Sequence, residues 1–415
     1  MSHLKLISFL CLIFLSSNLL ADNHSVILIK NATIITASDQ GTLENTDLLI
    51  EDGIIKDIGK NLIVNDGSEI DATGKFITPG LIAPHTTLGL QEIELEAETR
   101  DDSTDHYSAG FSIAKAFNPA SSLIPYNRAG GITSAIVTPS SASGIFSGMA
   151  SAFKINGALM TESMIEDIAL VMNLGGNKDS RASTIMSLED SFEVARRFAM
   201  KRSSIMRGDD FDFGDYSIRD LDAIQRLLKQ DIPLVVRANR ASDLLRMIEI
   251  ANQYEIRIIF AGAKEAWRIA DIIAKESIPV IIDPMDNIPS SFDSIAARLD
   301  NAAILENSGV KVLISSQSDH NSYLSRQGAG NAVTYGLSKE AAIKALTIHV
   351  AETFGIADQI GSIEAGKDAD IVIWDNDPLE VSSFTTKVLI DGENMSLMTR
   401  SKRLRDRYLE KLGLN

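Results

Sequence analysis

The sequence contains a single cysteine, Cys11, which lies in the apolar segment at the N-terminus. A chain with one cysteine has no internal disulfide, so its stability does not depend on an oxidising compartment. Positive charge is also scarce, because 39 Lys and Arg stand against 56 Asp and Glu and give a net charge of −17. Nucleic-acid binding relies on basic surfaces, so this balance argues against a nucleic-acid partner.

Long apolar runs are missing everywhere except near the N-terminus. There, Lys5 precedes the run Leu6 to Leu15, and the small residue Ala21 follows a short polar stretch. This pattern is typical of a secretory signal peptide, so we expect residues 1–21 to be removed and the protein to be periplasmic or secreted. The run is too short to favour a membrane span, and no small-residue lipobox precedes Cys11. We therefore expect no stable membrane span after cleavage.

Short β-rich segments occur at both ends of the remaining sequence, which at 45% hydrophobic residues can form a large core. Strands are predicted near the start, one of them in a hairpin at Asp52-Gly53, and again near the end. Their ranges are Val26 to Ile35, Asp47 to Ile58, Glu69 to Ile77, Asp370 to Trp374 and Lys387 to Asp391. Because no helix separates neighbouring strands, residues 22–78 and 361–396 together predict a small β-sandwich.

Residues 79–360 show a different pattern, in which apolar strands alternate with helical segments. This alternation is typical of parallel βαβ units. Seven strands are recognisable, beginning near Leu81, Ser134, Ile168, Pro233, Ile256, Ile278 and Val310. Helices are predicted between them, including Lys264 to Lys275 and Ser291 to Asn307. Closure of an eight-stranded barrel is the simplest architecture, with one middle strand unidentified.

The stretch TPGLIAPHTTLGL, Thr78 to Leu90, places His85 and Thr87 at the end of the first barrel strand. It resembles the first barrel strand of the amidohydrolase superfamily, which reads P-G-x-I-D-x-H-x-H. Further similarity lies in GSIEAGKDADIVIWDNDP, Gly361 to Pro378, and in segments such as NRAGGITSAIVTP, which are similar to an exported, imidazolonepropionase-like group. The resemblance implies an α/β fold, with a (β/α)8 TIM-like barrel and a β-sandwich built from both termini.

The resemblance also implies a metal site at the strand ends. Family ligands are two histidines on the first strand, often a modified lysine or a glutamate mid-barrel, a histidine on each of the fifth and sixth strands, and an aspartate on the eighth. Here His85 matches the first histidine. Thr87 stands at the second histidine position, Arg237 at that of the fifth strand, and the segment Ala261 to Ala263 at that of the sixth. Asp319, followed by His320, is the candidate on the eighth strand. We therefore expect a degenerate site that holds either one divalent ion, zinc or manganese, at His85 and Asp319 or no metal.

Two functional hypotheses follow from this site. In the first, the protein is a hydrolase of a non-peptide carbon–nitrogen bond in a small cyclic amide or imide. His85 and Asp319 would be catalytic or hold the metal, and Arg237, Thr87 and His320 would bind substrate. In the second, the protein is a metal-free pseudo-enzyme that binds an anionic small molecule at the barrel mouth, because arginine suits carboxylate or phosphate. Barrels of this family are often dimers, so a homodimer is a further expectation.

Residues 397–415 are rich in basic side chains and predict a helix over Thr399 to Leu412. Two interpretations of this helix remain open. It either docks on the acidic body of the protein or contacts an anionic membrane surface. We favour docking, since the rest of the chain is acidic.

Overall fold

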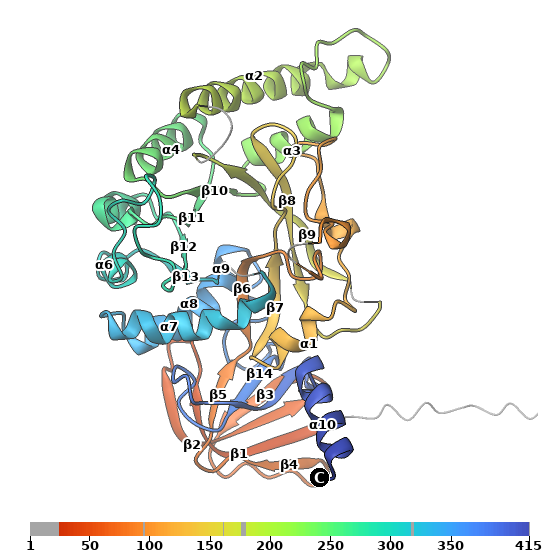
Figure 1. The fold of residues 1–415 in the computed structure, drawn as a ribbon, viewed down its shortest axis with the longest axis vertical. Helices are drawn as coiled ribbons and strands as arrows, with labels where there is room; N and C mark the ends of the chain where they lie inside the picture. The colour runs from red at the N-terminus through yellow and green to blue at the C-terminus, as the bar shows by residue number, and fades with distance from the viewer. Residues whose placement is uncertain (1–24, 94–95, 161, 176–179, 317–318, 415) are drawn as a thin grey trace, which may run out of the picture.

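The computed structural model describes residues 25–93, 96–160, 162–175, 180–316 and 319–414, except the side chains of Asp319 and His320. Its strands form two sheets, one above the other in Figure 1, with most helices around the upper sheet. The upper sheet is formed by the middle of the chain. The lower sheet is formed by strands from both ends of the chain.

The upper sheet is an eight-stranded, nearly closed barrel in which every strand pairs with its neighbours in chain order. Its last strand lies beside its first. The strands are β6 (Leu81–Thr86), β7 (Ile132–Val137), β8 (Phe146–Lys154), β9 (Ser163–Asn173), β10 (Leu234–Ala238), β11 (Ile258–Gly262), β12 (Val280–Ile282) and β13 (Val312–Ile314). This arrangement confirms the predicted α/β barrel class.

The strand that sequence analysis could not identify is β8, and it differs from the predicted βαβ pattern. It runs antiparallel to both β7 and β9, so these three strands form a meander without intervening helices. Its sequence, FSGMASAFK, contains glycine and several small residues but no β-branched residue, and all but its last residue are buried. Strand propensity is therefore low in this segment, and burial on both faces hides the alternation that marks a half-buried strand.

The helices mostly follow the barrel strands, as the sequence predicts, although two predicted helices are shorter. The segment expected to be helical from Ser291 is helical only in α6, because Ser294 and its neighbours form turns closed by side-chain hydrogen bonds. The segment expected to be helical from Lys264 begins as the 3-10 helix η3 (Ala266–Ile269) and continues as α5. The α-helices are α1 (Leu123–Arg128), α2 (Arg181–Ile205), α3 (Ile218–Leu228), α4 (Ala241–Tyr254), α5 (Ala270–Lys275), α6 (Asn301–Asn307), α7 (Ser325–Thr334), α8 (Lys339–Leu346), α9 (Ile348–Thr353) and α10 (Arg400–Leu412). None of the helices within the described ranges is long and apolar enough to cross a membrane.

The lower sheet joins the two ends of the chain through one central strand. Strand β5 pairs with β1 on one side and with β14 on the other. The sheet order is β16-β15-β14-β5-β1-β2-β3, with β4 paired to β1. The strands are β1 (Val26–Ile35), β2 (Thr42–Glu51), β3 (Ile54–Gly59), β4 (Ser68–Asp71), β5 (Phe76–Pro79), β14 (Ile371–Trp374), β15 (Thr385–Ile390) and β16 (Glu393–Asn394). Its buried side chains, among them Ile29, Leu48 and Ile371, form a core separate from that of the barrel.

Lys154 links the barrel to the lower sheet. Lys154, at the end of β8, contacts the carboxylates of Asp368, Asp370 and Asp391, with Nζ–O distances of 2.7 Å to Asp368 and 3.3 Å to Asp370. Burial lowers the pKa of Lys154, but the three carboxylates outweigh burial and hold it above its ordinary value. The segment Gly361 to Pro378, whose sequence resembles the family most clearly, therefore has a structural role at this junction.

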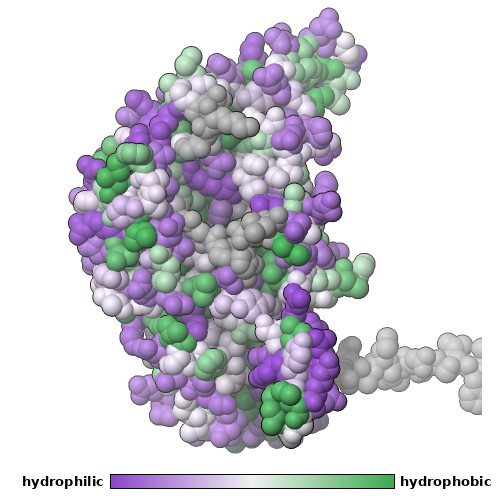
Figure 2. Space-filling view, in the orientation of Figure 1, coloured by the Kyte–Doolittle hydropathy of each residue, from purple (hydrophilic) through white to green (hydrophobic). Residues whose placement is uncertain are grey.

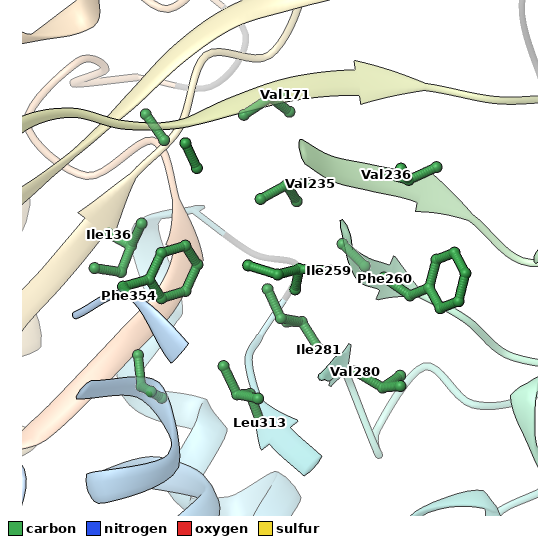
Figure 3. Packing of buried hydrophobic residues seen from close by; sticks show 14 of the residues in the cluster. Ile136, Val171, Val235, Val236, Ile259, Phe260, Val280, Ile281, Leu313 and Phe354 are labelled. Atoms are coloured by element: carbon green, nitrogen blue, oxygen red, sulfur yellow. The ribbon is translucent and has the colours of Figure 1, made fainter. Parts of the chain in front are cut away.

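The barrel core shows why particular side chains reach the mouth. In Figure 3, Val235, Ile259 and Ile281 gather on one side of their strands, whereas Val236 and Phe260 point to the other side. Successive residues of a strand alternate between its faces. A residue two positions after one of the inward-pointing side chains therefore also points inward, one step closer to the end of the strand.

Candidate functional site

Two residues further along each strand, the side chains inside the barrel change from apolar to mostly polar. The apolar layer contains Val171, Val235, Ile259, Ile281 and Leu313. The residues two positions further along these strands are Asn173, Arg237, Ala261, Asp283 and Ser315, and all five line one cavity. The cavity has a volume of about 660 Å³ and lies at the carboxyl ends of the parallel strands. This is the end at which barrel enzymes carry their active sites.

Two of the residues predicted from the sequence, Arg237 and His85, are in direct contact in this cavity. Arg237 Nε donates a hydrogen bond to His85 Nε2 at 2.8 Å. The two Nη atoms of Arg237 donate to the carbonyl oxygens of Ser140 and Pro139, at 2.9 and 2.5 Å. The guanidinium is therefore held in one orientation between β6, β10 and the loop that follows β7.

This contact determines the protonation state of the histidine. Burial and the neighbouring charge of Arg237 lower the pKa of His85 from 6.5 to about 3. The imidazole is therefore neutral at physiological pH. Because Nε2 accepts the hydrogen bond from Arg237, the proton of the neutral ring lies on Nδ1.

The described residues do not fit the metal site that the resemblance implies. Arg237 and Gly262 stand at the ends of the fifth and sixth barrel strands, and neither offers a ligand side chain. Thr87 lines the cavity, but its hydroxyl lies 3.5 Å from Gln91 Oε1. Within the described ranges, no three His, Cys, Asp or Glu side chains are grouped as metal ligands are. The side chains of Asp319 and His320, the candidates on the eighth strand, lie outside the described residues.

The sixth-strand position is closed to any side chain by a neighbouring asparagine. Gly262 has a φ of +87°, and a Cβ at this residue would lie 2.6 Å from Asn239 Oδ1. That oxygen is buried, and no hydrogen-bond partner is found for it among the described residues. Asn239 therefore occupies the space into which a sixth-strand ligand would project, and its amide borders the cavity.

A second arginine shortly after the fifth barrel strand, Arg240, has a different environment. Its Nη2 lies 2.9 Å from Asp293 Oδ1, and Arg181 also contacts that carboxylate, at 2.7 Å. Arg181 Nε in turn lies 2.7 Å from Asp243. These residues form an ion-pair network at the edge of the cavity, so Arg240 is a structural residue here and provides a matched comparison for Arg237.

Two cavity residues were missed as candidates by sequence analysis, namely Asn173 and Asp283. Asn173 ends a barrel strand and Asp283 directly follows one, the same position that identified His85 and Arg237. Asn173 also lines a second, more polar cavity of about 820 Å³ beside the first. His106 is exposed and lines that second cavity.

Comparison with known proteins places this geometry in a family. Residues 76–395 match the model of the amidohydrolase family. A crystal structure of an amidohydrolase from Thermotoga maritima MSB8 is 28% identical, has a TM-score of 0.80, and overlaps 89% of this chain and 99% of its own. Among curated proteins, amidohydrolase tasK of Hapsidospora irregularis is 25% identical over 83% of this chain and 39% of its own length.

Shorter matches point in the same direction. D-hydantoinase of Geobacillus stearothermophilus is 41% identical over 24% of this chain and 19% of its own length. A dihydroorotase of Thermoanaerobacter is 43% identical over 20% of this chain and 19% of its own. The chain thus spans less than half the length of these curated relatives. Their names are those of hydrolases of carbon–nitrogen bonds. On its sequence match and its fold, this chain belongs to the amidohydrolase family.

Proposed function

We propose that the mouth cavity binds a small cyclic amide or imide that carries an acidic group, and that a non-peptide carbon–nitrogen bond of this molecule is hydrolysed there. The observation that supports this most directly is the Arg237 guanidinium, held against His85 at the end of the fifth barrel strand. Its charge lies where members of the family carry a metal ligand. Arginine is well suited to bind carboxylate, and a fixed positive charge also stabilises a developing oxyanion.

The described side chains supply distinct roles for such a reaction. Arg237 would bind the acidic group or the carbonyl oxygen of the ring in exchange for its long contacts, of 3.4 to 3.5 Å, with Ser147, Asn173 and Thr138. His85, whose Nε2 is engaged by Arg237 and whose pKa is about 3, is a positioning residue that fixes the guanidinium rather than a base. A base that accepts a proton from water must come from a carboxylate at the strand ends. Asp283 lines the cavity, and Asp319 remains the candidate from the sequence.

A second candidate function is supported by the same hydrogen bond. The Nε2 atom of His85 is a nitrogen through which a histidine binds metal, and here it accepts a hydrogen bond from a cation. A protein that had exchanged catalysis for binding would show such a replacement. In this alternative the chain is a metal-free pseudo-enzyme that holds an anionic small molecule at Arg237 without turnover.

An assay of ring opening distinguishes the two functions. The purified chain, treated with a chelator, is tested on dihydroorotate and on hydantoins and succinimides with and without a carboxymethyl group. Hydrolysis by the unmodified chain that is lost in at least one of the variants Asp283→Asn and Asp319→Asn supports the hydrolase function. Binding of the carboxylated compounds without any ring opening supports the pseudo-enzyme. Failure of every compound to bind would contradict both.

We further propose that the protein acts after export, because its N-terminus has the sequence of a signal peptide, with Lys5, an apolar run and Ala21. N-terminal sequencing of protein recovered from a bacterial periplasm tests this, and we expect Asp22 as the first residue. Recovery of uncleaved protein from the cytoplasm would contradict it.

A further inference from the structure

The C-terminal helix α10 lies against the lower part of the molecule without joining its core. No residue of α10 is buried, and none belongs to either hydrophobic core cluster. The residues just before the helix are different, since Met395 and Leu397 pack against the barrel core. Docking, which sequence analysis favoured, predicts a covered face, and in the structure Leu404 and Leu409 are half-buried but no side chain of the helix is fully buried. The chain is therefore anchored up to Leu397 and then presents a helix to solvent.

The helix is nevertheless well defined at both ends. Thr399 caps its N-terminus by accepting a hydrogen bond from the backbone nitrogen of Lys402 at 3.2 Å. Gly413 ends it in the left-handed conformation, with a φ of +66°. Both signals stop a helix at a fixed length. A capped helix of 13 residues without a fully buried side chain is marginally stable in water, so its stability is expected to depend on a surface that it contacts.

One side of α10 carries a cationic stripe, which we define as Arg400, Arg403, Arg407 and Lys411. These residues are spaced by three, four and four positions, so they lie along one line of the helix. Like charges at this spacing repel one another and destabilise a helix in isolation. The acidic residues of the helix, Asp406 and Glu410, stand three positions after Arg403 and Arg407, and Asp406 is paired with Arg405. An anionic surface facing the stripe would relieve the repulsion.

Beside the cationic stripe runs an apolar one at steps of four residues, formed by the half-buried Leu404 and the exposed Tyr408 and Leu412. Tyr408 is 55% exposed and Leu412 is 68% exposed, and Leu414 beyond the cap is 65% exposed. Figure 2 shows this region at the lower right as strongly hydrophilic, with a hydrophobic group at its lower end. A basic stripe next to exposed apolar side chains is the pattern of a helix that lies in a membrane interface.

We propose that α10 binds the surface of an anionic phospholipid bilayer and holds the barrel next to it. The cationic stripe would face the lipid phosphates, while Tyr408, Leu412 and Leu414 would enter the region between headgroups and acyl chains. The charge of the whole chain, −17, supports a specific orientation, because the acidic body would be repelled by the same surface. An acidic protein or polymer would satisfy the charges but leaves the apolar stripe without a role.

Sedimentation with lipid vesicles tests this proposal. The chain from Asp22 onward is used, so that the apolar N-terminal segment does not contribute, and the first described strand, β1, is intact. Vesicles of phosphatidylcholine are compared with vesicles that also contain phosphatidylglycerol, at low and high salt. We expect binding only to the anionic vesicles, weakened by salt because the Debye length shortens.

Two double variants with the same change in net charge distinguish the effect of the cationic stripe on binding from the effect of overall charge. Arg403→Glu with Arg407→Glu reverses the stripe, and we expect each substitution to weaken binding by roughly fivefold or more. Lys402→Glu with Arg405→Glu makes the same change on other sides of the helix, and we expect a much smaller loss. Tyr408→Ser with Leu412→Ser keeps all charges and should also weaken binding. Thermal unfolding of each variant shows whether the body stays folded, as expected for a helix outside the core.

Three results would overturn the proposal. The first is the absence of binding to phosphatidylglycerol vesicles at low salt. The second is an equal loss in both charge-reversed pairs, which would mean that overall charge and not the stripe is responsible. The third is binding to polyglutamate as tight as to vesicles and insensitive to Tyr408→Ser, which would identify an acidic polymer as the partner.

Discussion

The Nε atom of Arg237 lies 2.8 Å from Nε2 of His85, and this hydrogen bond joins the fifth and first strands of the barrel across its mouth. It brings together the one histidine that matches the metal-binding pattern of the family and the arginine that replaces another ligand. The pair places the positive charge of Arg237 in the cavity, against a neutral His85. Predictions about stability and binding follow from it.

The first prediction concerns acid stability. The folded-state pKa of His85 is lowered to about 3, whereas the unfolded chain titrates near 6.5. Between these values the unfolded state binds more protons, so stability is lost as the pH falls. From pH 7 to pH 4.5 the loss should be on the order of 3 kcal/mol. Urea unfolding measures it, and His85→Gln, which can still accept from Arg237, should remove this part of the pH dependence. An unchanged pH dependence in His85→Gln would contradict the assignment.

The second prediction concerns the junction between the two sheets. Replacing Lys154 by Met leaves the carboxylates of Asp368, Asp370 and Asp391 close together without their shared cation. Removing one partner of a buried ion pair typically costs about 3–5 kcal/mol, and we expect a loss of this size in urea unfolding. Lys339→Met is the matched control, because Lys339 pairs with Asp377 but is 66% exposed. Its loss should stay below about 1 kcal/mol. Similar losses in both variants would show that the junction does not depend on Lys154.

The third prediction concerns the closed sixth-strand position. Gly262→Ala combines backbone strain at a φ of +87° with a contact of 2.6 Å to Asn239. Gly366→Ala has the same strain, with a φ of +91°, but nothing lies within 4 Å of the added Cβ. We expect a loss of about 1–2 kcal/mol for Gly366→Ala. Gly262→Ala should lose about 1–3 kcal/mol more because of overpacking. Equal losses would mean that Asn239 moves aside freely and does not close this position.

Much of the fold could be predicted from the sequence because local signals and packing agree there. The β-branched segment Val26 to Ile35 forms β1 with the predicted bounds, and the apolar helix pattern of Ala241 to Tyr254 forms α4. Strand β8 could not be found, because its small residues carry no strand propensity and only the surrounding barrel buries them. The prediction of a helix from Ser291 to Asn307 was wrong before Asn301, also because of tertiary contacts. Glu265 Oε1 accepts a hydrogen bond from the backbone of Ala296, and this tertiary contact favours turns over helix.

Residues of the candidate site could be predicted where the sequence showed the end of a barrel strand. His85 and Arg237 were identified because they follow apolar runs, and the structure brings them into contact. The bond between them could not be predicted, since it depends on how far the strands tilt and stagger in the barrel. Arg237 and Arg240 also look equivalent in the sequence. Only the structure shows that Arg240 is paired with Asp293 at the edge of the cavity.

The central claim is that Arg237, rather than a metal held by the described residues, binds the acidic group of a ligand. Calorimetric titration of the chelator-treated protein with carboxylated hydantoins and succinimides tests it most directly. We expect that binding persists without added metal, weakens by about tenfold or more in Arg237→Gln, and is unchanged in Arg240→Gln. Thermal unfolding of both variants confirms that each is folded. Binding that requires a divalent ion and is unaffected by Arg237→Gln in a folded protein would contradict the account.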